Sequence, residues 1–171
     1  MVDGKKYKSK ILYDAHLEFQ KAVDQHLIES FDLEGGNVSK KSRYTSYKPI
    51  IDGNKFDSLM EAKYFLHLLQ LQCKGDIQHL VRQPHFVLQE AFTKNGKKYR
   101  PIEYVADFRY QIVNTDQWVI VDVKGKETVE FKLKQKLFEY KYPELSLSVI
   151  QLYGDEWLEL SEIRKLKRKK K

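Results

Sequence analysis

Two apolar stretches on either side of one turn constrain the fold of this chain most. Apolar side chains alternate along residues 99–113, and residues 118–124 read WVIVDVK. Turn-forming residues at Asn114–Gln117 separate the two stretches. If the chain folds back about Asn114-Thr115, Val113 pairs with Asp116, and Asp107 then faces Asp122. The sequence therefore predicts a β-hairpin in which two acids are direct neighbours.

The opposed acids predict a cation site. Like charges that face each other in a half-buried sheet are destabilising, whereas a divalent cation such as Mg²⁺ takes carboxylate oxygens as ligands. Lys124 lies two residues after Asp122, so both side chains leave the same face of the strand. Its ammonium can lower the pKa of an attacking water or meet the charge that develops on a phosphate. A turn shifted by one residue would make the acids diagonal neighbours, still close enough to share a metal.

Glu61 has two interpretations. It lies in the first turn of a predicted helix over 59–73, on the side that also carries Phe65 and Leu68, so its carboxylate can reach the edge of the apolar layer and bind metal. However, Ser58-x-x-Glu61 also has the pattern of a capping box, in which the glutamate only stabilises the helix start. The two roles are not exclusive.

The predicted elements give an α/β fold. Helices are expected over 11–33, 59–73, from about Thr128 to Tyr142-Pro143, and over 155–163. Strands are expected over 81–92, with an interruption near Pro84, and over 99–113, 118–124 and 145–152, with Asn95-Gly96 as a hairpin turn. The order helix, three meandering strands, helix and strand favours a mixed sheet with helices for both faces.

The net charge belongs to the end of the chain. The 171 residues carry a net charge of +7, and Arg164–Lys171 contains seven basic residues and no acid. The remaining residues hold equal numbers of acids and bases, so the body is formally neutral and the tail need not fold. A single cysteine excludes an internal disulfide, and no apolar run approaches a membrane span. These two features fit a reducing, intracellular setting, so we expect a cytoplasmic protein. No glycine-rich phosphate loop is present, so we expect no nucleotide cofactor.

At this point the residues resemble the PD-(D/E)XK nuclease superfamily, with Glu61 in a helix, Asp107 within ADF, and Asp122-Val123-Lys124. The similarity is closest to small phage-encoded nucleases of the Holliday junction resolvase kind and covers roughly residues 50–152. Ala106 stands where the superfamily motif has proline, which leaves the metal ligand unchanged. The resemblance implies a restriction-endonuclease-like core with an extra N-terminal helix. The segments that carry it are FDSLMEAKYF, LVRQPHFVL, YVADFRY, VIVDVKGKET and FKLKQKLFEYKYPELSLSVI.

The resemblance also implies a phosphodiesterase that depends on Mg²⁺ or Mn²⁺. Asp107, Asp122 and the carbonyl of Val123 would bind the metal, and Glu61 would complete or orient its ligand sphere. Lys124 would position or activate the water. Lys134 and Gln135 follow on the next helix, where superfamily members often place phosphate-contacting groups, although a solvated helix face explains them as well.

Acid-free basic clusters indicate where DNA would lie. We expect contacts to phosphates from the linker, the hairpin tip, and the loop and helix after Lys124. Tyr44 and Tyr47 could stack on unpaired bases. No segment looks like a sequence-reading helix, which favours structure-selective cutting. The residues expected to bind DNA are Lys40, Lys41, Arg43, Lys97, Lys98, Lys126, Lys134 and Gln135.

The expected organisation has three parts. Residues 1–46 form a helical arm and basic linker, residues 47–163 a nuclease domain, and residues 164–171 a basic tail. We expect a homodimeric, structure-specific DNA endonuclease that resolves branched DNA in phage recombination or replication, in the host cytoplasm if the protein is phage-encoded. One alternative is a DNA-end nuclease, such as an exonuclease or a transposon end-cleaving subunit. Another is a non-catalytic DNA-binding adaptor with a nuclease-like fold.

Overall fold

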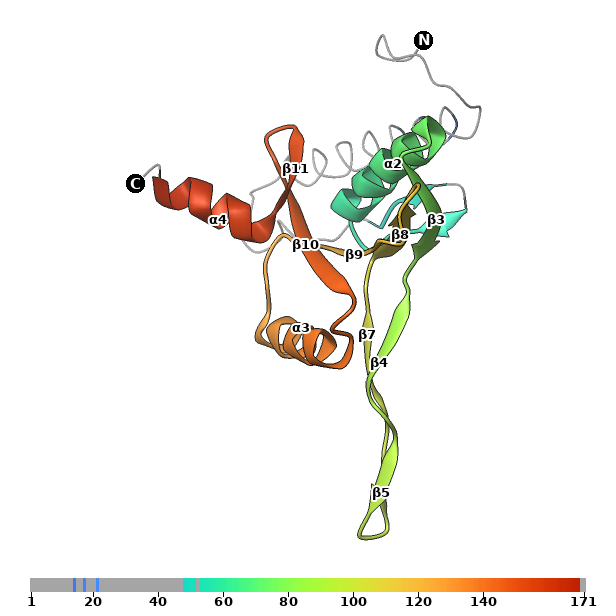
Figure 1. The fold of residues 1–171 in the computed structure, drawn as a ribbon, viewed down its shortest axis with the longest axis vertical. Helices are drawn as coiled ribbons and strands as arrows, with labels where there is room; N and C mark the ends of the chain where they lie inside the picture. The colour runs from blue at the N-terminus through green and yellow to red at the C-terminus, as the bar shows by residue number, and fades with distance from the viewer. Residues whose placement is uncertain (1–13, 15–16, 18–20, 22–47, 52, 170–171) are drawn as a thin grey trace, which may run out of the picture. The chain divides into compact units, whose positions relative to one another are not determined.

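A computed structural model describes residues 14, 17, 21, 48–51 and 53–169 of the chain. The chain divides into two compact units, with the boundary between Gly75 and Asp76 (Figure 1). Asp14, Leu17 and Lys21 are helical, in agreement with the predicted helix over 11–33 at these three positions. The rest of that helix lies outside the described residues, as do Lys40, Lys41 and Arg43 of the predicted basic linker.

The first unit contains a short hairpin and one long helix. Strands β1 (Ile50–Ile51) and β2 (Asn54–Lys55) pair antiparallel. Helix α2 (Leu59–Lys74) begins after Ser58 and ends at Gly75, whose φ of 81° lies in the left-handed region that glycine tolerates best. The predicted helix over 59–73 is therefore confirmed.

A five-stranded mixed sheet forms the centre of the second unit. Its strands follow the order β11-β10-β9-β8-β3. Strands β3, β8 and β9 form an antiparallel meander, β10 runs parallel to β9, and β11 pairs antiparallel with β10. The strand bounds are Ile77–Arg82 (β3), Phe108–Ile112 (β8), Trp118–Val123 (β9), Ser146–Tyr153 (β10) and Glu156–Glu159 (β11).

The predicted register of the central hairpin is confirmed. Phe108 pairs with Val121, and Gln111 pairs with Trp118. Continuing the same pairing past the start of β8 sets Asp107 opposite Asp122. The turn includes Asn114, whose φ of 61° is one that asparagine adopts more readily than most residues.

Helix α3 (Val129–Lys141) makes the crossover from β9 to the parallel strand β10. It starts as predicted, since the Thr128 side chain accepts a hydrogen bond from the Phe131 N–H at 3.1 Å. Phe131 and Phe138 of this helix are buried in a hydrophobic core that also includes side chains of strands β4 (His85–Gln89), β7 (Ile102–Val105), β9 and β10. The buried members of that core are Phe86, Leu88, Tyr104, Ala106, Ile120, Phe131, Phe138, Leu147 and Val149.

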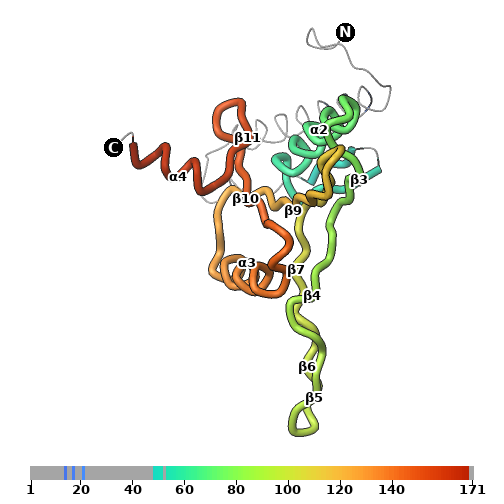
Figure 2. Tube along the Cα trace, in the orientation of Figure 1, coloured from blue at the N-terminus to red at the C-terminus, as the bar shows by residue number. Residues whose placement is uncertain are grey.

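The predicted interruption of the 81–92 strand near Pro84 is confirmed, whereas the prediction of a single strand over 99–113 was wrong, because the chain leaves the sheet after Arg82 and returns to it only at Phe108. Gln83 has a φ of 47° and Pro84 has no N–H to donate, so β3 ends before them. The intervening chain forms a separate two-stranded arm that extends away from the sheet (Figure 2). The arm strands are His85–Gln89 (β4), Phe92–Lys94 (β5), Lys97–Tyr99 (β6) and Ile102–Val105 (β7).

The prediction for the end of the chain was also wrong. Instead of a helix over 155–163, Gly154-Asp155 forms a turn into β11, and Gly154 has a φ of 64° that suits a tight hairpin. Helix α4 (Leu160–Lys169) follows, so most of the basic tail is folded. Ile163 explains why this segment is helical, since its side chain is only 1% exposed and packs the basic helix against the rest of the second unit. No helix among the described residues is long and apolar enough to cross a membrane.

Candidate active site

The candidate site is built around one buried acid. Asp122 lies on the central strand β9 and is 1% exposed, the only charged side chain among the described residues that is buried. A carboxylate in such a position is destabilising unless other groups compensate its charge and its lone pairs. The partners of Asp122 therefore define the chemistry of the site.

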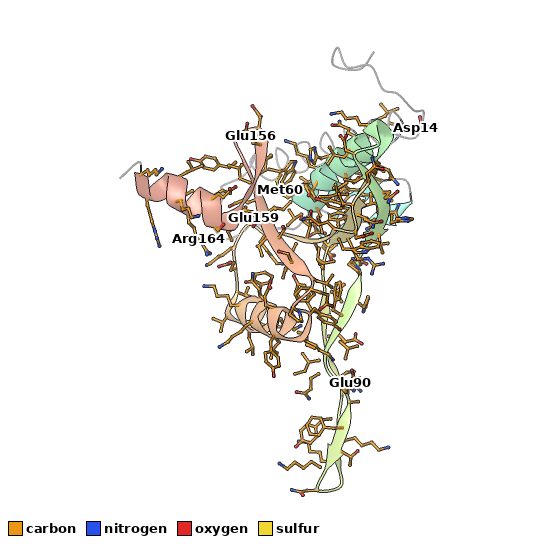
Figure 3. All side chains as sticks on the ribbon, in the orientation of Figure 1. Asp14, Met60, Glu90, Glu156, Glu159 and Arg164 are labelled. Atoms are coloured by element: carbon orange, nitrogen blue, oxygen red, sulfur yellow. The ribbon has the colours of Figure 1, made fainter. Side chains whose placement is uncertain are left out.

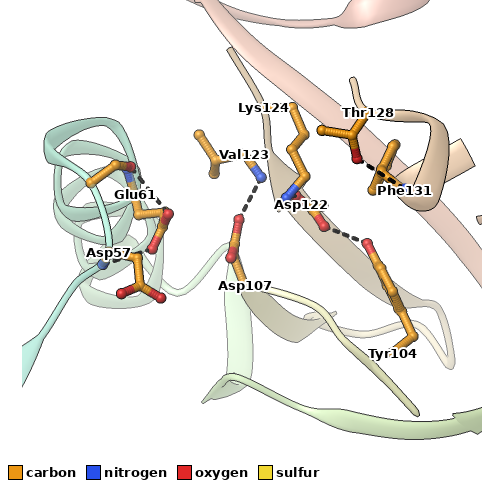
Figure 4. A network of polar contacts seen from close by, with 10 residues as sticks. Asp57, Glu61, Tyr104, Asp107, Asp122, Val123, Lys124, Thr128 and Phe131 are labelled. Atoms are coloured by element: carbon orange, nitrogen blue, oxygen red, sulfur yellow. Dashed lines mark hydrogen bonds and ion pairs between the residues drawn. The ribbon is translucent and has the colours of Figure 1, made fainter. Parts of the chain in front are cut away.

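Oδ1 of Asp122 has an ion-pair partner and Oδ2 a hydrogen-bond donor, while Oδ1 accepts no hydrogen bond from the described residues. The Lys124 ammonium lies 2.6 Å from Oδ1, as expected for residues that share one face of a strand. The hydroxyl of Tyr104, on β7, donates a hydrogen bond to Oδ2 (Figure 4). Tyr104 is itself 4% exposed, and its ring contacts those of Phe131 and Phe138. Asp122 is thus held between a cation and a donor that packing fixes in place.

Burial raises the pKa of Tyr104 well above the ordinary value of a tyrosine. The charge of Asp122, the hydrogen bond to it and the charge of Asp107 act in the same direction. Tyr104 therefore keeps its proton at neutral pH and serves as a permanent donor.

Asp107 is held by the backbone of β9. Its N–H donates to the Val121 carbonyl at 3.0 Å, and its Oδ2 accepts from the Val123 N–H at 2.7 Å (Figure 4). The side chain consequently points at the segment that carries Asp122. The structure thus brings together Asp107, Asp122, Val123 and Lys124, as the sequence predicted.

The donor set fits a hard divalent cation. Mg²⁺ is commonly held by one or two carboxylates and keeps several waters, and two carboxylates are what this site offers. The described residues contain no group of three or more His, Cys, Asp or Glu suited to a metal ion. If a metal is bound here, Asp107 and Asp122 would hold it together with water and a backbone carbonyl such as that of Val123.

Glu61 belongs to the first unit and acts there as a helix cap. Its N–H donates to the Ser58 hydroxyl at 3.1 Å, and its carboxylate accepts from the Asp57 N–H at 3.2 Å (Figure 4). The predicted capping box is confirmed. The role of Glu61 as a metal ligand stays a prediction.

The predicted DNA-contacting residues of the second unit lie on three elements. Lys97 and Lys98 are exposed on strand β6 of the arm, and Lys126 is exposed in the loop after β9. On α3, Lys134 forms an ion pair with Glu130 at 3.1 Å, one turn away, and Gln135 is half-buried. The interpretation of Lys134 as part of a solvated helix face therefore has a specific contact in its favour.

Sequence reasoning missed two groups that surround the site. Alternation assigns Tyr104 to the apolar face of a strand, and no signal marks its hydroxyl. Glu127, in the loop after Lys124, forms ion pairs with Arg164 of α4 and with Lys132 of α3, the latter at 3.6 Å. Figure 3 labels Arg164 on its helix. This bridge could not be foreseen because α4 itself was not predicted.

Comparison with known proteins gives one match. The family model described as "Protein of unknown function (DUF1064)" matches residues 41–153, which include the arm and all four residues of the site. No curated protein and no solved structure matches the chain significantly. Because the matched segment is more than half of the chain, this protein belongs to the DUF1064 family.

Proposed function

We propose that this protein is a metal-dependent DNA endonuclease of the PD-(D/E)XK kind that cuts branched DNA. One observation carries the proposal: a buried aspartate on the central strand lies opposite a second aspartate, with a lysine on the same face. A protein with only structural demands gains nothing from opposed acids in its sheet, since they repel each other. A divalent cation with a phosphate substrate accounts for all three charges.

The order of the elements supports the same proposal. Helix α2, the meander of β3, β8 and β9, helix α3 and the parallel strand β10 follow one another as in a restriction-endonuclease-like core. The acids occupy the meander in the order that the superfamily motif requires. The arm between β3 and β8 and the C-terminal pair β11 and α4 are additions to this core.

Each residue of the site has a distinct task in the proposed reaction. Asp107, Asp122 and the Val123 carbonyl would hold Mg²⁺ or Mn²⁺. When bound, such an ion polarises a phosphate oxygen and lowers the pKa of a coordinated water. The Val123 N–H and the Tyr104 hydroxyl keep the two carboxylates in fixed orientations. The Lys124 ammonium supplies positive charge where the attacked phosphate gains negative charge.

The substrate is proposed to be branched DNA, and the active form a homodimer, because resolving a junction requires two symmetric cuts. A DNA-end nuclease and a non-catalytic adaptor are the competing functions. They differ in a simple way: the first cuts linear ends as fast as junctions, and the second binds DNA but cuts nothing.

The experiment incubates the full chain with a four-way junction, a nicked duplex and a linear duplex, with Mg²⁺, with Mn²⁺ and with a chelator. We expect metal-dependent cuts near the branch point. Lys124→Ala and Asp107→Asn should each lower the cleavage rate at least ~100-fold while junction binding persists. Lys63→Ala and Asp155→Asn, which change exposed residues away from the site, are the matched controls. Full activity in either site variant would refute the site, and equal cleavage of linear duplex and junction would leave only the nuclease part of the proposal.

A further inference from the structure

The two-stranded arm is exposed to solvent over most of its length. Every residue from Gln89 to Glu103 is exposed, on both strands and on both faces. Only the base of the arm is packed against the body. There the ring of Phe86, on the arm, meets the ring of Tyr142 edge to face, with 5.5 Å between the ring centroids. Figures 1 and 2 show the outer half, β5 and β6, extending beyond the rest of the second unit. A bare two-stranded hairpin is marginally stable in water, so its persistence calls for a use.

The outer arm is strongly basic. Lys94, Lys97, Lys98 and Arg100 lie within seven residues, with no acid between Glu90 and Glu103. Among the described residues, no carboxylate forms an ion pair with any of the four. The two flanking acids are engaged at the base, where Glu90 pairs with Lys141 at 3.3 Å and Glu103 lies 3.5 Å from His85. Figure 3 labels Glu90 at this point of the arm. The outer arm therefore carries four uncompensated positive charges.

Two of these charges directly oppose each other. Lys94 and Lys97 are partners in the β5–β6 ladder, on either side of the Asn95-Gly96 turn. Lysines are common on exposed sheet edges because they prevent edge-to-edge aggregation, and that role would explain single lysines here. It does not explain a directly opposed pair, which destabilises the hairpin. As with the opposed acids, the repulsion is relieved by a ligand of opposite charge, in this case an anion.

The arm is also stiffened near its tip. Phe92 and Tyr99 are ladder partners whose rings stack at 4.6 Å with an angle of 5° between their planes. Lys97 lies over the Tyr99 ring at 5.2 Å. Asn95 and Gly96 have φ values of 51° and 73°, as a two-residue hairpin turn of the type that matches strand twist requires. Such a ribbon is ordered before it meets its ligand, so binding does not have to order it.

We propose that this arm, residues 89–103, inserts into the major groove of duplex DNA. A two-stranded ribbon fits that groove, which is about 12 Å wide and about 8.5 Å deep. The six residues from Gln89 to Lys94 span roughly 20 Å at about 3.3 Å per residue, which is more than the groove depth. Lys94, Lys97, Lys98 and Arg100 would then lie beside the phosphates of both strands. That the ligand of the arm is DNA rests on the proposed function.

The test measures binding without cleavage. Lys94, Lys97 and Lys98 are all changed to Gln in a protein that also carries Asp107→Asn, and the affinity for a labelled duplex is followed by fluorescence anisotropy in chelator at several salt concentrations. We expect at least ~10-fold weaker binding and a salt slope that is smaller by about 2–3, since each lost phosphate contact removes about 0.9 from the slope. The matched control changes the exposed Lys55, Lys63 and Lys74 to Gln in the same background, with the same loss of charge. Equal affinity and equal slope in the two triple variants would overturn the proposal.

A second readout tests the groove itself. Guanine N7 faces the major groove, so an inserted arm should protect guanines from methylation by dimethyl sulfate. The protection should disappear in the arm variant and remain in the control variant. An arm that strengthens binding without protecting any guanine, or that binds single strands better than duplex, would refute groove insertion. If the arm is needed for binding but the protein never cuts DNA, the proposed nuclease function is refuted and the inference about the arm stands. If the protein cuts DNA but binding does not depend on the arm, the inference about the arm is refuted and the nuclease function stands.

Discussion

Changing Tyr104 to Phe should destabilise the second unit by about 1.5–3 kcal/mol. The substitution keeps the ring that contacts Phe131 and Phe138 and removes only the hydroxyl that donates to Asp122. A hydrogen bond to a charged group contributes about 1.5–3 kcal/mol, and here the loss would leave Oδ2 of a carboxylate that is 1% exposed without its donor. Water cannot easily replace the donor at this depth.

The assay is urea or thermal unfolding followed by tryptophan fluorescence. The chain has two tryptophans, Trp118 on β9 and Trp157 on β11, so the signal reports on the second unit. For a chain of this size, a loss of about 2 kcal/mol corresponds to a fall in Tm of about 4–8 °C. Tyr140→Phe is the matched control, since Tyr140 is 86% exposed and should stay within about 0.5 kcal/mol of wild type. If Tyr104→Phe is equally neutral, the donor does not hold Asp122 and the description of the site is wrong.

The remaining predictions concern pH, the basic helix and the cap. Because the pKa of Tyr104 is raised in the folded state, the folded protein binds this proton more tightly than the unfolded chain does. The stability advantage of wild type over Tyr104→Phe should therefore be constant below about pH 10 and should shrink above it by up to about 1.4 kcal/mol per pH unit. An advantage that grows with pH would contradict the raised pKa. Ile163→Ala should lower the free energy of unfolding by about 2–4 kcal/mol because α4 is fastened by this buried side chain, and no effect in the same fluorescence assay would show that the basic tail is unfolded after all. Ser58→Ala should cost about 1 kcal/mol through loss of the α2 cap, measured by circular dichroism, with the exposed Ser161→Ala as its control.

The register of the central hairpin could be predicted because local rules determine it. Successive side chains of a strand leave opposite faces, and a short turn leaves few ways to pair the strands. For that reason the alternation and the turn together suffice to place Asp107, Asp122 and Lys124 side by side. The start of α3 at Thr128 and its end before Pro143 were predictable for the same reason, since capping residues and proline act over a few positions.

The partners of the site could not be predicted, because they depend on distant segments. Tyr104 reaches Asp122 only because the chain leaves the sheet after Arg82 and returns at Phe108, and alternation alone does not show such an excursion. The Asn95-Gly96 turn was predicted, but not that its two strands stand apart from the sheet. Helix α4 was missed because a run of lysines is typical of a solvated tail, and only the burial of Ile163 shows otherwise.

Binding of Mn²⁺ to the isolated protein tests the central claim most directly, because it requires neither a DNA substrate nor turnover. Isothermal titration should show a saturable site in the wild-type chain, and both Asp107→Asn and Asp122→Asn should weaken it by at least about 10-fold. Asp155→Asn, which changes an exposed acid in a surface turn, should bind Mn²⁺ as wild type does. Identical titrations for the wild-type chain and the two site variants would contradict the claim that these opposed acids form a metal site.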